Sequence, residues 1–399
     1  MKLLLLTNEY PPYIYGGAGV HVENMSRELS RLCQVEVRCF GDQSIKKDSL
    51  TIQGYQNPTR HYSLPECQHR VFDALERCIH FNTDQIDADI VHVHTWYTHW
   101  GGILAKINYG IPLVLTVHSL EPLRPWKREQ LGKGYDFSCW VEKTAIEMAD
   151  AVIAVSSDTK KDILKFFKIP ESKIHVIPNG VDPDVYKPTK DPRVLQKFGI
   201  DPQKPFVLFI GRITRQKGIL HLVNAIPFMN KNFQIVLCAC APDTKEIAKE
   251  MELQMKEAQK THPHLLWIKD MLDEEEKVAL YSQASVFCCP SVYEPFGIIN
   301  LEAMACETPV VASAVGGIKE VVQDGLTGFL VPVPLKNTSL FEPKSPETFS
   351  KTLANRINQI MTDEPLRTRL GKAGRKHVLT QFTWKKIAQK TLDLYKSLI

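Results

Sequence analysis

The chain has 399 residues, more than one hydrophobic core usually holds, so two domains of about 200 residues each are expected. Apolar residues make up 44% and charged residues 24%, a balance that excludes a disordered chain. The net charge of +4 is small and no run of Lys or Arg dominates, which argues against a nucleic-acid partner.

The apolar run near the amino terminus, residues 3–6, ends at Asn8 and Glu9, too early for a secretory signal or a membrane span. We therefore expect a cytoplasmic protein with no clear membrane association. The ten cysteines are irregularly spaced and form no C-x-x-C pair, so reduced core cysteines are expected, with neither a disulfide framework nor structural zinc.

Residues 1–182 are predicted to form an amino-terminal α/β domain. Its apolar strands are expected at residues 2–8, 35–40, 90–94, 112–118, 151–156 and 174–177. Helical spacing is seen in Val22, Met25, Leu29 and Leu32, in an amphipathic segment at residues 70–81 and again at residues 138–148. This alternation predicts a mostly parallel, doubly wound sheet with right-handed crossovers.

A segment with four prolines and little apolar content, residues 178–192, is typical of an interdomain linker. The alternation then restarts, with strands expected at residues 206–210, 234–239, 265–268, 286–289, 309–312 and 329–333. A second doubly wound domain is therefore predicted at residues 183–379, followed by a helical segment at 380–399. We expect the carboxyl ends of the two sheets to face each other across a cleft, because such sheets bind ligands at those ends.

The first candidate cluster is the glycine loop that follows the first strand. Gly16 and Gly17 let the backbone approach a ligand, and the next helix offers N–H donors to an anion. The spacing is not G-x-G-x-x-G, so a nicotinamide oxidoreductase loses most of its support. A purely structural turn is the alternative.

The second cluster is the pair Arg212 and Lys217, in a loop between a predicted strand and a predicted helix. A guanidinium can bind phosphate oxygens in a bidentate way, and an ammonium adds a compact point charge. Together they could hold a diphosphate without a metal. The alternative is a solvated basic loop, which also contains Arg215.

The third cluster surrounds a helix expected from about residue 296 to 306. Glu294 lies in the loop before this helix and Glu302 about two turns into it. Carboxylates accept hydrogen bonds from vicinal hydroxyls, so two of them suit a sugar and a ribose. The helix start, Phe296, Gly297 and Ile298, is expected to present N–H groups to the same ligand. Exposed charges without a function are the alternative for both glutamates.

Histidines and tryptophans of the first domain complete the candidates. His118 ends an apolar strand and could bind a sugar hydroxyl, with a structural histidine as the alternative. His92 and His94 share a strand face, but no acidic or cysteine residue lies nearby at ligand spacing, so no metal is expected. Trp96 and Trp100 could stack on the rings of a bound ligand or could belong to the core.

Taken together, these motifs resemble the retaining glycosyltransferases with the two-domain GT-B fold. The stretch EPFGIINLEA matches their E-x7-E signature and GRITRQKG matches their donor-phosphate loop. YGGAGVHV matches the amino-terminal glycine loop in a form similar to the family 4 glycogen synthases of the actinobacterial type. The resemblance covers most of the chain.

The resemblance implies transfer of glucose from a nucleotide-glucose, with ADP-glucose as the expected donor, and retention at the anomeric carbon. The acceptor would be an α-1,4-glucan or glucose 1-phosphate, which gives maltose 1-phosphate, and no further cofactor is expected. Two alternatives stay open: another GT-B hexosyltransferase, of sucrose, trehalose or lipid-sugar mannosyl type, or a non-catalytic nucleotide-sugar-binding homologue. The donor base and the oligomeric state also stay open.

The resemblance further implies a role for each candidate in the carboxy-terminal domain. Arg212 and Lys217 would stabilise the departing nucleoside diphosphate, and Glu302 would bind the ribose. Glu294 would lie near the 3- and 4-hydroxyls of glucose and, with the two cations, belong to the catalytic set.

In the amino-terminal domain the resemblance implies that Gly16 and Gly17 bind the diphosphate. His118, the remaining catalytic candidate, would contact the 6-hydroxyl of the sugar, with its backbone carbonyl near the reacting carbon. The last helix, residues 380–399, would return to this domain.

Overall fold

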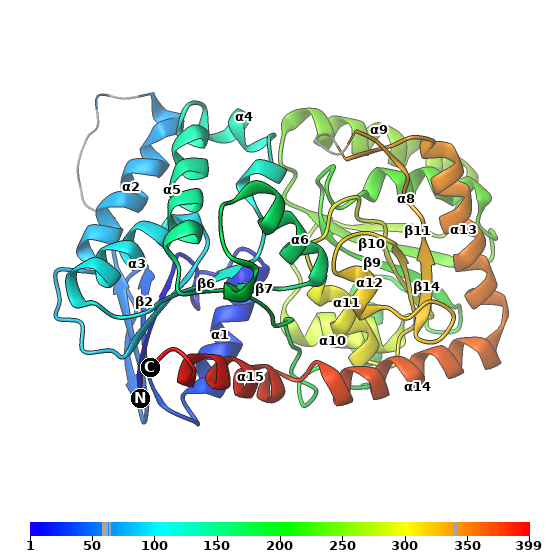
Figure 1. The fold of residues 1–399 in the computed structure, drawn as a ribbon. Helices are drawn as coiled ribbons and strands as arrows, with labels where there is room; N and C mark the ends of the chain where they lie inside the picture. Colours follow the sequence, from blue (N-terminus) through cyan, green and yellow to red (C-terminus); the bar gives the residue numbers. More distant parts are fainter. Residues whose placement is uncertain (58–62, 64, 338–340) are drawn as a thin grey trace. The chain divides into compact units, whose positions relative to one another are not determined.

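The computed structural model describes residues 1–57, 63, 65–337 and 341–399 (Figure 1). The chain divides into two compact units, the first comprising Met1–Gly180 with Trp384–Ile399 and the second Val181–Thr383. The sequence placed these divisions after residues 182 and 379. The two doubly wound α/β domains expected from the sequence are confirmed, and each unit is described below by itself.

Unit 1 is built on an eight-stranded sheet with the order β3-β4-β2-β1-β5-β6-β7-β8. All neighbours are parallel except β3 and β4. The strands are β1 (Lys2–Thr7), β2 (Gln34–Phe40), β3 (Ser44–Lys47), β4 (Leu50–Tyr55), β5 (Ile90–His94), β6 (Leu113–Val117), β7 (Ala151–Ala154) and β8 (Ile174–Val176). The helices are α1 (Gly17–Leu29), α2 (Glu66–His80), α3 (Trp96–Tyr109), α4 (Lys127–Leu131), α5 (Gly134–Met148), α6 (Ser157–Phe166) and α15 (Trp384–Lys396), with short 3-10 turns at Glu121–Leu123 and Glu171–Lys173.

The central strands of unit 1 are mostly apolar, as expected for a parallel sheet with helices on both faces. Successive side chains of a strand point to opposite faces, so β1 contributes to two cores. Leu3 and Leu5 pack in the core that also holds residues of α1 and α15. Leu4 and Leu6 pack in the other core, with residues of α3 and α5. The carboxy-terminal helix α15 thus forms part of the first core, and both chain termini lie in this unit (Figure 1).

Several local features of unit 1 differ from expectation, among them helices α4 and α6, which were not predicted. The hairpin of β3 and β4 was not predicted, and β3 has the exposed side chains of an edge strand. Helix α3 was not predicted either, because its first residues were interpreted as an aromatic binding segment. Helix α1 ends at Leu29, so Leu32 lies beyond its apolar face and is exposed.

Unit 2 is built on a six-stranded parallel sheet with the order β11-β10-β9-β12-β13-β14, beside a two-stranded sheet of β15 and β16. The strands are β9 (Phe206–Arg212), β10 (Gln234–Cys240), β11 (Leu265–Ile268), β12 (Val286–Cys289), β13 (Val310–Ser313), β14 (Gly328–Val331), β15 (Leu335–Asn337) and β16 (Glu342–Pro343). The helices are α7 (Pro192–Lys197), α8 (Ile219–Ala225), α9 (Lys245–Thr261), α10 (Glu274–Gln283), α11 (Ile298–Ala305), α12 (Ile318–Val321), α13 (Pro346–Thr362) and α14 (Glu364–Gln381), with a 3-10 turn at Ile226–Phe228.

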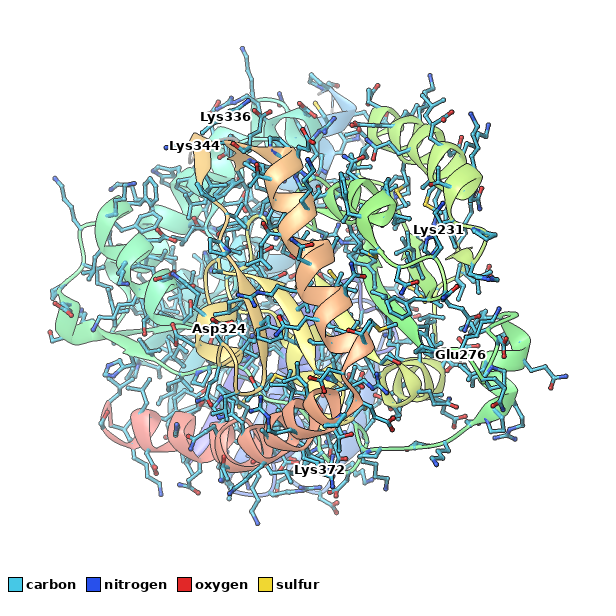
Figure 2. All side chains as sticks on the ribbon, turned by 90° about the vertical axis from the view of Figure 1, so that its right-hand side faces the viewer. Lys231, Glu276, Asp324, Lys336, Lys344 and Lys372 are labelled. Atoms are coloured by element: carbon cyan, nitrogen blue, oxygen red, sulfur yellow. The ribbon has the colours of Figure 1, made fainter. Side chains whose placement is uncertain are left out.

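The strand order of unit 2 runs outward from β9 to β11 on one side and from β12 to β14 on the other, as in Rossmann folds. Figure 2 shows this unit with α13 in front of its strands and with charged side chains around it; the labelled Lys231 and Lys372 lie apart from Lys336 and Lys344. Helices α9 and α10 were not predicted. Within the described residues, no helix combines the length and the apolar character that crossing a lipid bilayer requires.

Candidate active site

The loops after β9 and β12 are neighbours in unit 2, because the strand order reverses between these two strands. The backbone N–H of Val292 donates to the carbonyl of Gln216 across 2.9 Å and so joins the two loops. Gly218 has φ +64°, and a Cβ there would lie 2.0 Å from the carbonyl oxygen of Pro290. Only glycine accommodates this approach, which fixes the loops at the site where Rossmann sheets bind ligands.

Lys217 and Glu294 meet across these two loops. The Nζ of Lys217 donates to Oε2 of Glu294 across 2.6 Å, and the hydroxyl of Ser291 lies 3.4 Å from the same oxygen. Burial, the largest single cause, would lower the pKa of Lys217, but the charge of Glu294, the nearby Cys289 and the hydrogen bond to Glu294 together outweigh it and raise the pKa above its usual value. Lys217 therefore stays positively charged although its side chain is mostly buried.

A glycine turn after β13 holds the backbone of Glu294. Gly316 has φ +48°, and a Cβ on it would lie 1.9 Å from the carbonyl oxygen of Glu294. The N–H of Gly317 donates to that oxygen across 3.2 Å. Glu294 is thus held by its backbone on one side and by Lys217 on the other.

Arg212 is the last residue of β9 and pairs through its guanidinium with Asp243, 3.1 Å away. Its charge is close enough to Lys217 to act against the rise in the pKa of that lysine. Two cations therefore lie together at the switch point of the sheet, which is a suitable arrangement for binding a diphosphate.

Helix α11 starts at Ile298, later than predicted, because Gly297 before it has the left-handed φ of +94°. Phe296 is buried and Ile298 is half-buried. Glu302 consequently lies one turn into the helix rather than two. Its Oε2 accepts a hydrogen bond of 3.0 Å from the hydroxyl of Tyr281, and burial raises its pKa above the usual value. The two glutamates therefore differ in environment, one ion-paired and the other buried beside a phenol.

In unit 1 the glycine loop is held by a residue that sequence reasoning missed. The Oε2 of Glu9 accepts hydrogen bonds from the N–H groups of Tyr15 and Gly16, at 2.9 and 2.8 Å. Helix α1 begins at Gly17, and a Cβ on Gly19 would lie 2.9 Å from Glu9. The N–H group of Gly16, which the sequence analysis expected to bind an anionic ligand, thus donates to the carboxylate of Glu9. The sequence feature that could have identified Glu9 is its position, as an acidic residue between a buried strand and a glycine loop.

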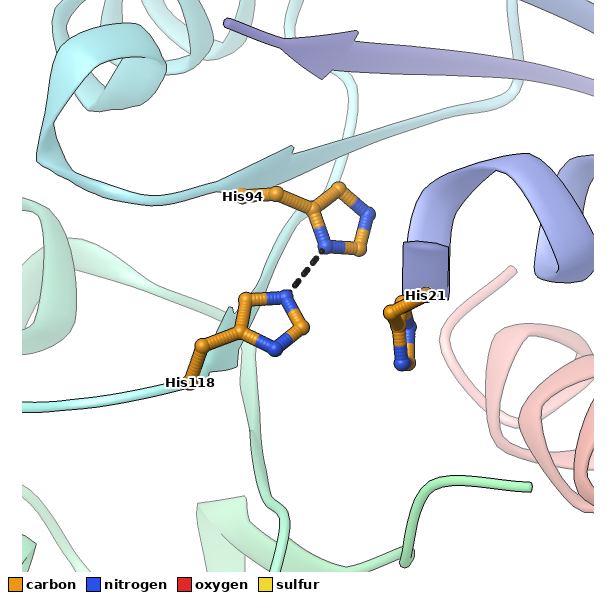
Figure 3. A group of neighbouring side chains, drawn as sticks. All are labelled: His21, His94 and His118. Atoms are coloured by element: carbon orange, nitrogen blue, oxygen red, sulfur yellow. Dashed lines mark hydrogen bonds between the residues drawn. The ribbon is translucent and has the colours of Figure 1, made fainter. Parts of the chain in front are cut away.

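His118 follows β6 in the same unit and lies beside His94, with 3.1 Å between Nε2 of His118 and Nδ1 of His94 (Figure 3). Burial, and then the neighbouring His21, lower the pKa of His118 well below its usual value, so the ring is neutral at pH 7. Trp96 is buried in a core cluster with α2 and α4, so it cannot stack on a glucan. Trp100 is partly buried and lies near Trp140.

The candidates thus form two groups, each within its own unit. Unit 2 brings together Arg212, Lys217 and Glu294, with Glu302 on the helix that follows the same loop. Unit 1 holds Gly16, Gly17 and His118 at the carboxyl ends of its central strands.

Comparison with known proteins agrees with this division. Residues 15–185 match the family described as Glycosyltransferase Family 4, and residues 191–377 match Glycosyl transferases group 1. An α-maltose-1-phosphate synthase of Mycolicibacterium smegmatis is 43% identical, over 99% of each chain. The chain belongs to this family of two-domain glycosyltransferases.

Two further relatives agree with that family. A glycogen synthase of Mycobacterium tuberculosis is 26% identical, over 99% of this chain and 94% of its own. The structure of sucrose-phosphate synthase from Thermosynechococcus elongatus superposes with a TM-score of 0.81 at 25% identity, covering 100% of this chain and 99% of the other. The chain is therefore a hexosyltransferase with the GT-B fold, an enzyme that moves a sugar from a donor to an acceptor.

Proposed function

We propose that this hexosyltransferase transfers glucose from ADP-glucose to glucose 1-phosphate, with retention at the anomeric carbon, and so forms α-maltose 1-phosphate. The observation that carries the proposal is the 43% identity to an α-maltose-1-phosphate synthase along the whole of both chains. The relatives are named as enzymes, which favours a catalytic protein over a non-catalytic nucleotide-sugar-binding homologue.

The donor is proposed to bind unit 2. The transition state of such a transfer resembles an oxocarbenium ion leaving an anionic diphosphate, so cations at the leaving group lower the barrier most. Arg212 and Lys217 supply these cations, and the ammonium of Lys217 has three donors, enough for Glu294 and a phosphate oxygen together. Glu302 offers a buried carboxyl to the ribose hydroxyls. In this scheme no metal and no carboxylate nucleophile are required.

The acceptor is proposed to bind unit 1, with its phosphate on Arg124. This arginine lies in the loop that follows His118, and its NH1 donates to the hydroxyl of Ser119 across 3.2 Å. Its Nε is buried and has no hydrogen-bond partner among the described residues, and Glu121 is 4.0 Å from its guanidinium. A guanidinium with an unused Nε–H donor, in the loop that follows His118, suits a phosphate ester.

Tyr97 supports the same place for the acceptor phosphate. Burial and then the charge of Glu121 raise the pKa of this tyrosine, while the charges of Arg124 and Arg70 act in the opposite direction. Two arginines therefore lie within electrostatic range of one phenolic hydroxyl. Phenol and guanidinium groups together are suitable donors for a dianionic phosphate.

Elongation of an α-1,4-glucan is the second candidate, favoured by the identity to a glycogen synthase. A neutral glucan chain end would make no use of Arg124. The acceptor therefore separates the two candidates.

The decisive experiment offers ADP-glucose, UDP-glucose or GDP-mannose with glucose 1-phosphate, with glycogen or with no acceptor, and determines the product and its anomeric configuration by NMR. An α-linked disaccharide phosphate from ADP-glucose is expected. Product only with glycogen would replace the proposal by the glucan synthase, and product only from GDP-mannose would replace it by a mannosyltransferase.

The acceptor site is tested with Arg124→Gln. We expect a rise of about tenfold or more in KM for glucose 1-phosphate, since a hydrogen bond to a charged group contributes roughly 1.5–3 kcal/mol. The KM for the donor should be unchanged. Arg128→Gln is the matched control, because Arg128 is exposed and pairs with Asp136. Equal effects of the two substitutions would contradict the assignment.

A further inference from the structure

Three histidines of unit 1 come together from separate elements: His21 from α1, His94 from the end of β5 and His118 from the loop after β6 (Figure 3). One ring nitrogen of each lies within 4.8 Å of the other two. We propose that this His21–His94–His118 cluster binds a borderline divalent transition-metal ion of the Zn²⁺ class, and that the bound ion inhibits sugar transfer. The inhibition rests on the proposed function of His118, whereas the binding does not.

The spacing of two of the rings already suits a shared ion. Nδ1 of His94 and Nε2 of His118 face each other at 3.1 Å. Two nitrogen ligands of a tetrahedral zinc ion, each bound at about 2.0–2.1 Å, lie roughly 3.3 Å apart. An ion between the rings would displace the proton that they share and would require only a small movement of either side chain.

His21 is held in the manner of a metal ligand. Its Nδ1 lies 2.7 Å from the amide oxygen of Asn179, and an amide oxygen only accepts, so the hydrogen of the neutral ring is on Nδ1. Nε2 then carries a lone pair, and this buried nitrogen has no hydrogen-bond partner among the described residues. Metal-binding histidines are usually oriented by such a hydrogen bond from their second nitrogen.

The rings are also in the protonation state that a metal requires, because only neutral imidazole binds one. Burial lowers the pKa of His21 to about 4, and burial also lowers the pKa of His94 and of His118 well below the usual value. His92, on the same strand face as His94, is different, since both of its ring nitrogens have partners in Tyr395 and Thr116. It is therefore not part of the cluster.

The donor set decides which ions fit. Three neutral nitrogens without a carboxylate do not suit Mg²⁺ or Ca²⁺, which prefer oxygen ligands. Three histidines with a fourth position left to solvent or an anion are a known zinc arrangement. An ion there would hold the ring of His118 and withdraw it from the transferred sugar.

The sequence argued against a metal because His92 and His94 had no ligand partner at a suitable spacing. The cluster instead draws on residues 73 and 24 positions away from His94 along the chain, since His21, His94 and His118 are brought together by the order of the strands.

The test is a Co²⁺ titration of the untagged, chelator-treated full chain, without substrates, followed by visible absorption. Tetrahedral Co²⁺ absorbs far more strongly than the hydrated ion, so an intense band that saturates at one equivalent and is abolished by Zn²⁺ is expected. His21→Gln should abolish the band, and His118→Gln, at a partly exposed position, provides a second variant if the first does not fold. His80→Gln, on α2, should leave the band intact.

No intense band, or an equal band in His21→Gln and His118→Gln, would overturn the site. The effect on catalysis is measured separately, as a loss of at least tenfold in turnover with Zn²⁺ that a chelator reverses. A band without such a loss would leave the metal site in place and reject the inhibition, and with it the role of His118 in transfer. The binding result holds whichever acceptor the enzyme uses.

Discussion

Lys217 donates to Glu294 across 2.6 Å, and the two side chains are only 19% and 11% exposed. This ion pair joins the loop after β9 to the loop after β12. Because removing one partner of a buried pair leaves the other charge without compensation, Lys217 and Glu294 are expected to act as one unit in any variant of the donor site.

The first prediction concerns the two cations. Lys217→Met and Arg212→Met should each lower kcat by about 100-fold or more, as when a group that stabilises developing charge is lost, with the far-UV circular dichroism unchanged. Arg215→Met is the matched control, because Arg215 lies in the same loop but is exposed and pairs with Glu250. Near wild-type kcat in both of the first variants would reject the assignment of the donor site.

The second prediction concerns the glycine that holds Glu294. Gly316→Ala should lower both the Tm and kcat, because its Cβ would meet the carbonyl oxygen of Glu294 at 1.9 Å and displace that residue. Gly325 has a similar left-handed φ of +72° but no atom within 4 Å of a Cβ. Gly325→Ala should therefore show backbone strain alone, about 1–2 kcal/mol, with kcat unchanged. If both variants kept full kcat, the turn would not position Glu294.

Most of the fold could be predicted because its strands are short apolar runs with alternating helices. The strands at 90–94 and 286–289 were placed at their observed bounds. The hairpin of β3 and β4 could not be found in the same way, since Ser44–Lys47 is exposed and Ile45 is its one apolar residue. Helix α9 is indicated by the sequence itself, because its buried residues Ile247, Met251, Met255 and Ala258 recur at helical spacing.

The candidate site was predictable only in part. Strand ends and the family motifs identified the residues, but contacts between distant segments depend on the order of the strands. Neither the pairing of Lys217 with Glu294 nor the meeting of His21 with His118 can be derived from local patterns, because each joins separate βα units. The start of α11 was misplaced because the left-handed φ of Gly297 does not follow from composition.

The third prediction concerns acid stability. Burial lowers the pKa of His21 to about 4 and that of His99 to about 3, whereas unfolded histidine titrates near 6.5. As the pH falls below about 6.5 the unfolded state binds protons that the folded state does not, so unit 1 should lose up to about 1.4 kcal/mol per pH unit for each such histidine. Stability should be full above pH 6.5 and fall towards pH 4.

This acid effect is measured by hydrogen exchange of unit 1 between pH 7.5 and 4.5, corrected for the intrinsic rates. His99→Phe should flatten the pH dependence, because both ring nitrogens of His99 are buried without hydrogen-bond partners among the described residues and no bond is lost. His80→Phe, at a partly exposed position of α2, is the control and should retain the slope. A pH dependence in His99→Phe as steep as in the wild type would contradict the lowered pKa of that histidine.

The last prediction concerns the helix that returns to unit 1. Trp384 begins α15, is 3% exposed, and packs edge-on against His21 with 5.3 Å between ring centroids. A Cβ on Gly180 would lie 2.8 Å from the backbone nitrogen of Trp384, so the chain is closely packed where α15 meets unit 1. Trp384→Ala should therefore cost unit 1 about 3–5 kcal/mol, the usual cost of removing a large aromatic side chain from a core. Trp140→Ala, at a position 51% exposed in the same unit, should cost much less.

Hydrogen exchange resolved by residue is the suitable measurement, because a chain with two units need not unfold in one step. Faster exchange confined to Val181–Thr383 would show that α15 stabilises the other unit instead, and equal losses in the two tryptophan variants would show that the buried Trp384 contributes no more than the exposed Trp140.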